Sequence, residues 1–344
     1  MRNTAIVLLV TAVLAEVALR VYHAIQPSFV FYDMSYNQYR GQPGGWHRDT
    51  RLNSLGFNDT EFSTEKAPGA FRIVALGDSF AFGVVPYRYN YLTLLEDMLK
   101  VRNLGAEVFN MGIASTSPYH YADLLFKEGL AFKPDGVIVS LFVGNDLTRR
   151  DARPKYTYSY LITFGRVVVR LVRNFRDVAR ATSATGPGPP YVDNQPFFSE
   201  EVFLRIQKDR SWIFQPQLRA ELDASIAAIT PFLKAIRDVC VERAVRLLIV
   251  LIPDEQQIDA AQQRAIATAA GVPLEQFDFD LPNRALAATL LGLKIDYLDL
   301  LPLMRERSKA QLLYLPRDTH WNIPGNRVAA EAIAARVADW VAAK

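Results

Sequence analysis

The sequence predicts an α/β fold, a three-layer αβα arrangement in which helices cover both faces of a parallel five-stranded sheet. Short apolar runs rich in β-forming residues alternate along the chain with segments of helical periodicity. Half of the 344 residues are hydrophobic, which is ample for a large core. Strands that alternate with helices are typical of a parallel sheet with helices on both faces.

The predicted elements of this domain follow one another from residue 71. Strands are expected at residues 71–76, 107–111, 137–143, 246–252 and 295–300. Helices are expected at residues 90–100, 119–131, 218–243, 256–270, 283–291 and 326–343. Most of the strand segments are predominantly apolar, as expected for strands that are buried on both faces.

The N-terminal residues predict a membrane helix. Residues 5–19 are apolar except for Thr11 and Glu16, and residues 4–22 reach the length of about 20 residues that a bilayer span needs. Glu16 lies near one end, where a carboxylate can reach the lipid headgroups. We expect residues 1–25 to be an uncleaved anchor with the enzyme in the periplasm. A cleaved signal peptide is the alternative, although no clear Ala-x-Ala site is present.

Two further segments flank or interrupt the α/β pattern. Residues 26–70 are polar and aperiodic, so we expect a lead-in that packs on the core of a domain spanning residues 71–344. Residues 147–214 are too long for an ordinary loop, and we interpret them as a helical insertion that acts as a lid, a substrate wall or a surface contact. Five arginines recur in residues 165–180 between apolar residues: Arg166, Arg170, Arg173, Arg176 and Arg180. This basic amphipathic helix either packs on the core or docks on anionic lipid.

Composition excludes several classes of protein. A net charge of +3, from 39 basic and 36 acidic residues, gives no reason to expect a nucleic-acid partner. The chain has neither a dinucleotide-binding glycine motif nor a P-loop, and no Cys and His residues have metal-ligand spacing, so no cofactor or metal is expected. The single cysteine, Cys240, cannot form an intrachain disulfide.

Gly77-Asp78-Ser79 is the most informative motif, because it follows a buried strand and precedes a helix. Ligands of open α/β sheets bind at the carboxyl ends of the strands, where Ser79 must lie. The alternative is an ordinary turn in which Ser79 caps the helix. Three further segments favour the functional interpretation: Asn110-Met111-Gly112, Gly144-Asn145-Asp146, and Asp318-Thr319-His320-Trp321 before the last helix.

These motifs, in this order, resemble the SGNH hydrolases, also called the GDSL esterase/lipase superfamily. The resemblance covers residue 71 to the C-terminus without the insertion, and it implies a flavodoxin-like sheet. It further implies that Ser79 is the nucleophile, that His320 is its general base and that Asp318 orients His320. The oxyanion donors would be the backbone N–H groups of Ser79 and Gly112 and the side-chain amide of Asn145.

One spacing departs from the family pattern. The usual Asp-x-x-His would place the acid at position 317, which is Arg317 here. Similar Asp-x-His-Trp pairs occur in the related branch that acetylates exopolysaccharides. His320 is therefore oriented by Asp318, by a backbone carbonyl or by an acid elsewhere in the chain. Asp78 and Asp146 are expected to brace their loops, and His120 to be structural or to line the cleft.

The resemblance implies a membrane-anchored serine esterase that forms an acyl-enzyme. Its partner would be an acylated saccharide or lipid of the cell envelope, with an O-acyl group such as O-acetyl as the reacting group. Two alternatives stay open. The first is an SGNH-type O-acetyltransferase of an exopolysaccharide, and the second is a catalytically silent binding module of an envelope complex.

Overall fold

The computed structural model of the chain describes residues 2–25, 40–102, 105–147, 159–162, 164–165, 168–169 and 190–342. Contacts divide the chain into two units, Met1–Gln38 with Asp151–Gly186, and Tyr39–Arg150 with Pro187–Lys344. The described part of the lead-in and the described residues after 189 belong to the unit that contains the sheet.

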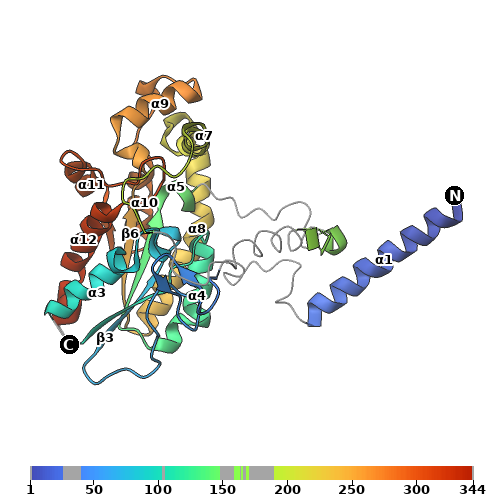
Figure 1. Cartoon of the computed structure of the whole chain (residues 1–344), viewed down its shortest axis with the longest axis horizontal. Coiled ribbons are helices and arrows are strands. Elements are labelled where there is room, and N and C mark those ends of the chain that lie inside the picture. The colour runs from blue at the N-terminus through green and yellow to red at the C-terminus, as the bar shows by residue number, and fades with distance from the viewer. Residues whose placement is uncertain are drawn as a thin grey trace. The chain divides into compact units, whose positions relative to one another are not determined.

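The larger unit is built on a five-stranded sheet in which all neighbouring strands are parallel (Figure 1). The strand order is β4-β3-β5-β6-β7. The strands are β3 (Phe71–Leu76), β4 (Ala106–Asn110), β5 (Gly136–Phe142), β6 (Arg246–Ile252) and β7 (Tyr297–Asp299). The chain leaves β3 towards β4 and then returns to the other side of β3 as β5. In open α/β sheets the ligand crevice lies at such a reversal, which in this sheet is at the carboxyl ends of β3 and β5.

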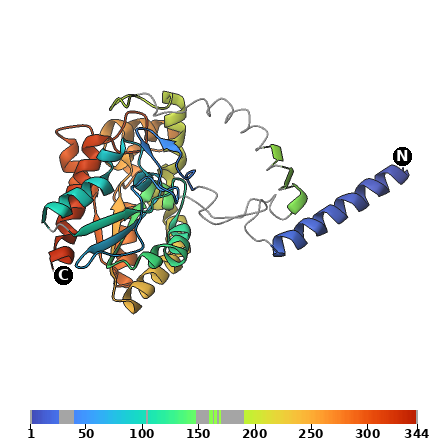
Figure 2. The same cartoon turned by 60° about the horizontal axis from the view of Figure 1, so that its bottom comes forward.

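Helices cover both faces of the sheet (Figures 1 and 2). One layer contains α3 (Tyr91–Arg102), α11 (Leu301–Ser308) and α12 (Ile323–Ala342), and the other contains α4 (Pro118–Lys127), α8 (Arg219–Glu242) and α10 (Leu281–Gly292). Besides several 3₁₀ turns, the other strands and α-helices that the structure describes in this unit are the hairpin β1 (Trp46–His47) and β2 (Thr50–Arg51), the short helices α2 (Ser79–Phe82) and α5 (Val143–Asp146), α7 (Glu200–Arg210) and α9 (Ala260–Ala270). The predicted αβα fold class is confirmed.

The central strands are buried on both faces. Ile73, Ile138 and Val250 join the cluster that contains the inner side chains of α3 and α12. Because side chains alternate along a strand, neighbours such as Val74 and Val139 point to the opposite layer, and they are equally buried. Each such aliphatic side chain contributes about 1.5–3 kcal/mol through burial. The strands are therefore held firmly, and their carboxyl ends are fixed points from which loops can present side chains.

Most predicted bounds lie within two residues of the observed ones, but α4 ends at Lys127 and not at residue 131, and α12 begins at Ile323 and not at residue 326. β3 and β6 begin and end as expected, whereas α9 begins at Ala260 and not at residue 256. Asp259 is the reason, because its carboxylate accepts hydrogen bonds from the N–H groups of Ala261 and Gln262 and so caps the helix there. Residues 255–257 form a separate 3₁₀ turn that Asp254 caps.

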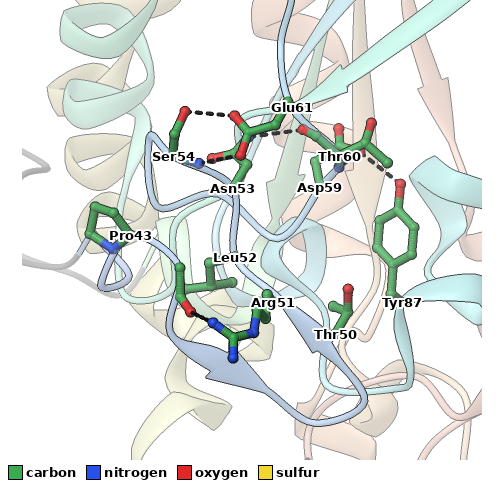
Figure 3. Close-up of a pocket in the computed structure, with 11 residues that line it drawn as sticks. Pro43, Thr50, Arg51, Leu52, Asn53, Ser54, Asp59, Thr60, Glu61 and Tyr87 are labelled. Atoms are coloured by element: carbon green, nitrogen blue, oxygen red, sulfur yellow. Dashed lines mark hydrogen bonds between the residues drawn. The ribbon is translucent and has the colours of Figure 1, made fainter.

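The described part of the lead-in packs on the domain. Arg40 pairs with Glu128, and the Phe62 ring stacks on Phe109 at 4.5 Å. A cavity of about 600 Å³ opens between the hairpin and residues 52–61 (Figure 3). Asp59 lies at the edge of this cavity. Burial raises the pKa of its carboxyl to about 7, although hydrogen bonds from the Asn110 N–H and the Tyr87 hydroxyl lower it. The lead-in thereby reaches Asn110, the first residue of the Asn-Met-Gly motif.

The smaller unit contains α1 (Arg2–Ile25), which is long and apolar enough over Asn3–Tyr22 to cross a membrane. A signal sequence has the same properties. Glu16 pairs with Arg20 at 2.7 Å and accepts hydrogen bonds from the N–H groups of Tyr160 and Leu161. The negative charge of the Glu16 carboxylate is thus paired with a positive charge within the same unit. Apart from residues 165, 168 and 169, the predicted basic helix of residues 165–180 lies outside the described residues.

Candidate active site

The β3 end presents Ser79 as the first residue of α2. Asp78 caps this short helix, since its Oδ1 accepts the Phe80 N–H at 2.9 Å. Gly77 lies against β5, because an added β-carbon would be only 3.1 Å from the β-carbon of Ser140 on that strand. Ser79 itself is partly exposed. Its own N–H belongs to the first turn of a helix and so has no partner within that helix.

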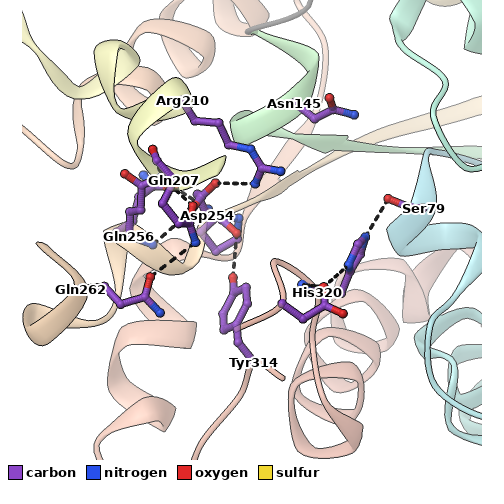
Figure 4. Close-up of polar contacts among 12 residues, drawn as sticks. Ser79, Asn145, Gln207, Arg210, Asp254, Gln256, Gln262, Tyr314 and His320 are labelled. Atoms are coloured by element: carbon purple, nitrogen blue, oxygen red, sulfur yellow. Dashed lines mark hydrogen bonds and ion pairs between the residues drawn. The ribbon is translucent and has the colours of Figure 1, made fainter. Parts of the chain in front are cut away.

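His320 connects Ser79 to Asp318 in a continuous hydrogen-bonded chain (Figure 4). Its Nε2 lies 2.8 Å from Ser79 Oγ, and its Nδ1 lies 2.6 Å from Asp318 Oδ1. The ring packs on Phe80, with 4.9 Å between ring centroids. The structure therefore brings together the three residues that the sequence predicts as a triad, in the order that a serine, its base and an orienting acid require.

A tight turn explains how the shorter Asp-x-His spacing still places the Asp318 carboxylate beside the His320 ring. The Asp318 N–H donates to the Leu315 carbonyl at 3.0 Å, and Arg317 adopts a left-handed φ of 52° within this turn. The chain then folds back, so that Asp318 Oδ1 accepts both the backbone N–H of His320, at 3.2 Å, and its ring Nδ1. Arg317 thus forms part of the turn at the position where the family pattern would have the acid.

Burial and hydrogen bonding act in opposite directions on Asp318. Burial raises the pKa of this carboxyl, but the hydrogen bond and the charge of His320 together lower the pKa below its usual value. The side chain is 9% exposed. An ionised carboxylate in this position can hold the imidazole in one orientation and stabilise it when it gains a proton.

Asn145 lies on α5, directly after β5, across the crevice from β3. Its Nδ2 donates to Asp78 Oδ2 at 3.3 Å, which ties the amide to the loop that carries Ser79. Asp146 is buried and accepts the Phe142 N–H at 3.0 Å and the Tyr121 hydroxyl at 3.1 Å. Asp78 and Asp146 therefore brace their loops, as the sequence led us to expect.

Gly112 differs from the expectation for an oxyanion donor. Its N–H already donates to Asn110 Oδ1 at 2.9 Å. The glycine also serves packing, because an added β-carbon would lie 2.5 Å from the β-carbon of Ala81 on α2. Its N–H would have to leave Asn110 before it could bind an oxyanion. Further along this loop, the Ile113 N–H bonds to the Gly77 carbonyl at 3.0 Å, and the exposed Ser115 adopts a left-handed φ of 69°.

Two other histidines have structural partners. His120 is buried, and its Nδ1 lies 3.0 Å from Ser117 Oγ in the first turn of α4, so it belongs to a helix cap. His47 Nε2 lies 2.8 Å from the Gly83 carbonyl oxygen, just beyond α2. In the part of the chain that the structure describes, no group of three or more His, Cys, Asp or Glu side chains is placed to hold a metal ion.

The sequence interpretation missed two residues beside the site, Asp254 and Arg210. Asp254 follows β6 directly after Pro253, so the rule that singled out residues after β3 and β5 would also have found it. Arg210 is the last residue of α7 and bonds to Asp254 at 3.3 Å. Nothing in the sequence spacing points to Arg210, because the insertion has no periodic relation to the sheet.

Comparisons with known proteins found one matching family and several similar solved structures. Residues 206–343 match a family described as "SGNH hydrolase-like domain, acetyltransferase AlgX". The C-terminal part of the chain, residues 206–343, is thus similar to an SGNH hydrolase-like domain. The matched residues include Asp318 and His320 of the hydrogen-bonded chain, whereas Ser79 lies before them. A comparison with curated proteins found no match.

Several solved structures are similar to this chain. An acetyl xylan esterase, AlAXEase, is 14% identical with a TM-score of 0.44, covering 78% of this chain and 100% of that one. A lipase/acylhydrolase from Enterococcus faecalis is 14% identical with a TM-score of 0.40, covering 78% and 96%. A lipolytic protein of the G-D-S-L family from Desulfitobacterium hafniense, itself described as putative, is 13% identical with a TM-score of 0.40, covering 77% and 98%.

Replacing Asn145 with alanine tests its expected role in the oxyanion hole. Because such a donor acts mainly in the transition state, we expect turnover to fall roughly 100-fold or more with little change in KM. Steady-state kinetics on a chromogenic acetyl ester would measure both parameters. A rise in KM at unchanged turnover would instead assign the amide to binding of the ground state.

Proposed function

We propose that this chain is a serine enzyme of O-acyl esters that works through an acyl-enzyme. The observation that carries the proposal is the hydrogen-bonded chain from Ser79 through His320 to Asp318. Ser79 Oγ attacks the acyl carbonyl carbon while His320 Nε2 takes its proton, and Asp318 stabilises the resulting imidazolium. When the tetrahedral intermediate collapses, His320 returns this proton to the departing alkoxide oxygen.

Resolution of the acyl-enzyme decides between two activities. If water attacks the acyl carbon, the acid is released and the enzyme is an esterase. If a sugar hydroxyl attacks, the acyl group moves to that oxygen and the enzyme is an O-acetyltransferase. The matched family description supports the second activity as well as the first, since it names an acetyltransferase beside the hydrolase-like domain. The proposed substrate is an O-acylated saccharide or lipid of the cell envelope, with O-acetyl as the first group to test.

The experiment uses the purified chain with p-nitrophenyl acetate, alone and with a soluble oligosaccharide acceptor. Release of nitrophenolate and acetate without acceptor indicates an esterase. Acetylated oligosaccharide in the mass spectrum, formed at the expense of free acetate, indicates a transferase. A third arm adds a fluorophosphonate probe, which reacts with activated serines. If neither turnover nor labelling occurs, the silent binding module is the better interpretation.

We also propose that α1 anchors the enzyme in a membrane, with the sheet-containing unit in the periplasm. The apolar span Asn3–Tyr22 supports the anchor, and every element of the sheet begins after it. We expect the full chain to sediment with membranes. A chain that lacks residues 1–25 should be soluble and as active as the detergent-solubilised full chain.

Fractionation of cells that express the two chains, followed by an ester assay on each fraction, measures this prediction. A mature protein that starts after residue 20 in N-terminal sequencing would show a cleaved signal peptide and contradict the anchor. Sedimentation of the truncated chain with anionic vesicles at low salt, lost at high salt, would point to a second attachment by the basic segment 165–180.

A further inference from the structure

The turn Pro253–Asp254, at the carboxyl end of β6, touches both halves of the candidate active site (Figure 4). On one side, the Asp254 carboxylate packs against Gly144, in the loop that carries Asn145, the proposed oxyanion donor. A β-carbon added to Gly144 would lie 2.1 Å from Asp254 Oδ2, so only glycine fits directly before Asn145. Any shift of this carboxylate therefore acts on the backbone that carries the Asn145 amide.

On the other side, the same turn supports the histidine loop. The Tyr314 hydroxyl donates to the Pro253 carbonyl at 2.6 Å, and Tyr314 is paired with Trp321 through an antiparallel bridge. Trp321 directly follows His320 and is almost completely buried. Residues 253 and 254 thus connect the segment that holds the base to the segment that holds the proposed oxyanion donor.

Arg210 holds this turn from α7. Its Nη1 donates to Asp254 Oδ2, the same oxygen that faces Gly144, and its guanidinium lies over the Phe142 ring at 5.5 Å. Phe142 is the last residue of β5 and directly precedes α5. Its ring also packs on Phe80, the residue after Ser79. Arg210 therefore contacts the Asn145 loop at its start and, through Asp254, at Gly144.

Buried glutamines fix the helix that carries Arg210. Gln207 and Gln256 are completely buried, and Gln256 Nε2 donates to Gln207 Oε1 at 2.8 Å. Gln207 lies three residues before Arg210, on the same face of α7. Gln256 in turn donates its backbone N–H to Asp254 Oδ1 at 3.1 Å. The pair is therefore built into a hydrogen-bonded frame and is not a flexible surface ion pair.

We propose that Arg210 and Asp254 are positioning residues for acyl transfer, which hold the Asn145 loop and the His320 loop at the distance that the reaction needs. This inference rests on the proposed function. Asp254 is fully buried, so its charge requires the partner that Arg210 supplies. A displacement of about 1 Å in a catalytic arrangement can cost about 100-fold in rate. The pair therefore acts on turnover and not on substrate affinity.

The test compares Arg210→Gln, Arg210→Lys and Asp254→Asn with the unchanged chain. We expect Arg210→Gln to lower turnover and the rate of fluorophosphonate labelling by about 10- to 100-fold at a similar KM. Arg210→Lys should recover part of the loss, because it keeps the charge but not the planar fork that lies over Phe142. The double variant Arg210→Gln/Asp254→Asn should lose much less turnover than the product of the two single-variant losses, since the two residues act as one unit.

The matched control is Arg219→Gln, which breaks the exposed pair of Arg219 with Asp223 at 2.7 Å on α8 and should leave all rates unchanged. A raised KM with normal labelling would make Arg210 a substrate contact and overturn the proposal, as would wild-type rates in Arg210→Gln. Where Asp254→Asn does not fold, Arg210→Gln decides the outcome alone. An unchanged chain that neither labels nor turns over ester would instead refute the proposed function.

Discussion

Ser79→Ala is expected to abolish ester turnover while the protein stays folded. In a comparable triad, loss of the nucleophile costs about 10⁶-fold in turnover, and loss of the base costs about as much. Ser79 is partly exposed and gives up only the hydrogen bond to His320, worth about 1 kcal/mol. The measurement pairs the rate of p-nitrophenyl acetate hydrolysis with the melting temperature of each variant.

Two further variants make the result for Ser79 specific. His320→Ala should lose turnover to nearly the same extent and should also lose fluorophosphonate labelling, because the hydroxyl then has no base. Ser63→Ala removes another serine hydroxyl from an exposed loop and should behave as the unchanged chain. Ester turnover that survives in Ser79→Ala would refute the serine mechanism, since nothing else in the proposal supplies the nucleophile.

The sequence predicted the sheet well because each central strand is a predominantly apolar run that cannot be placed elsewhere than in the core. It also predicted the residues at two strand ends, Ser79 and Asn145, because parallel strands bring their carboxyl ends to one edge. The crevice itself depends on the strand order, which no local pattern encodes. Its position between β3 and β5 became visible only in the structure.

The hydrogen-bond partners of individual groups could not be predicted from the sequence. Gly112 stands where the family pattern places a backbone donor, yet its N–H belongs to Asn110 two residues earlier. Which backbone N–H groups of this motif stay unbonded depends on how the loop folds. Arg210 was missed for a similar reason, because its contact with Asp254 depends on the packing of α7 against residues 44 positions further along the chain.

Asp318→Asn is expected to cut turnover by about 10⁴-fold, a smaller loss than that of Ser79→Ala or His320→Ala but a larger one than that of any other variant. The carboxylate accepts the ring Nδ1 proton and so fixes which nitrogen faces Ser79. An amide can present its NH₂ group to Nδ1 instead, which would place the proton on Nε2, where His320 can no longer accept one from Ser79. Asp223→Asn, at an exposed position on α8, is the control and should not change turnover.

Stability provides a second readout for Asp318 with a defined sign. Because its pKa is lowered in the folded protein, its ionised form contributes stability above the unfolded pKa of about 4, and this contribution is lost as the pH falls through the folded value. We therefore expect Asp318→Asn to be less stable than the unchanged chain to urea at pH 7, by a margin that shrinks at pH 3. A turnover loss of only a few-fold, with this margin intact, would mean that Asp318 stabilises the turn while another group orients His320. In that case the short Asp-x-His spacing would have kept its structural role without the catalytic one.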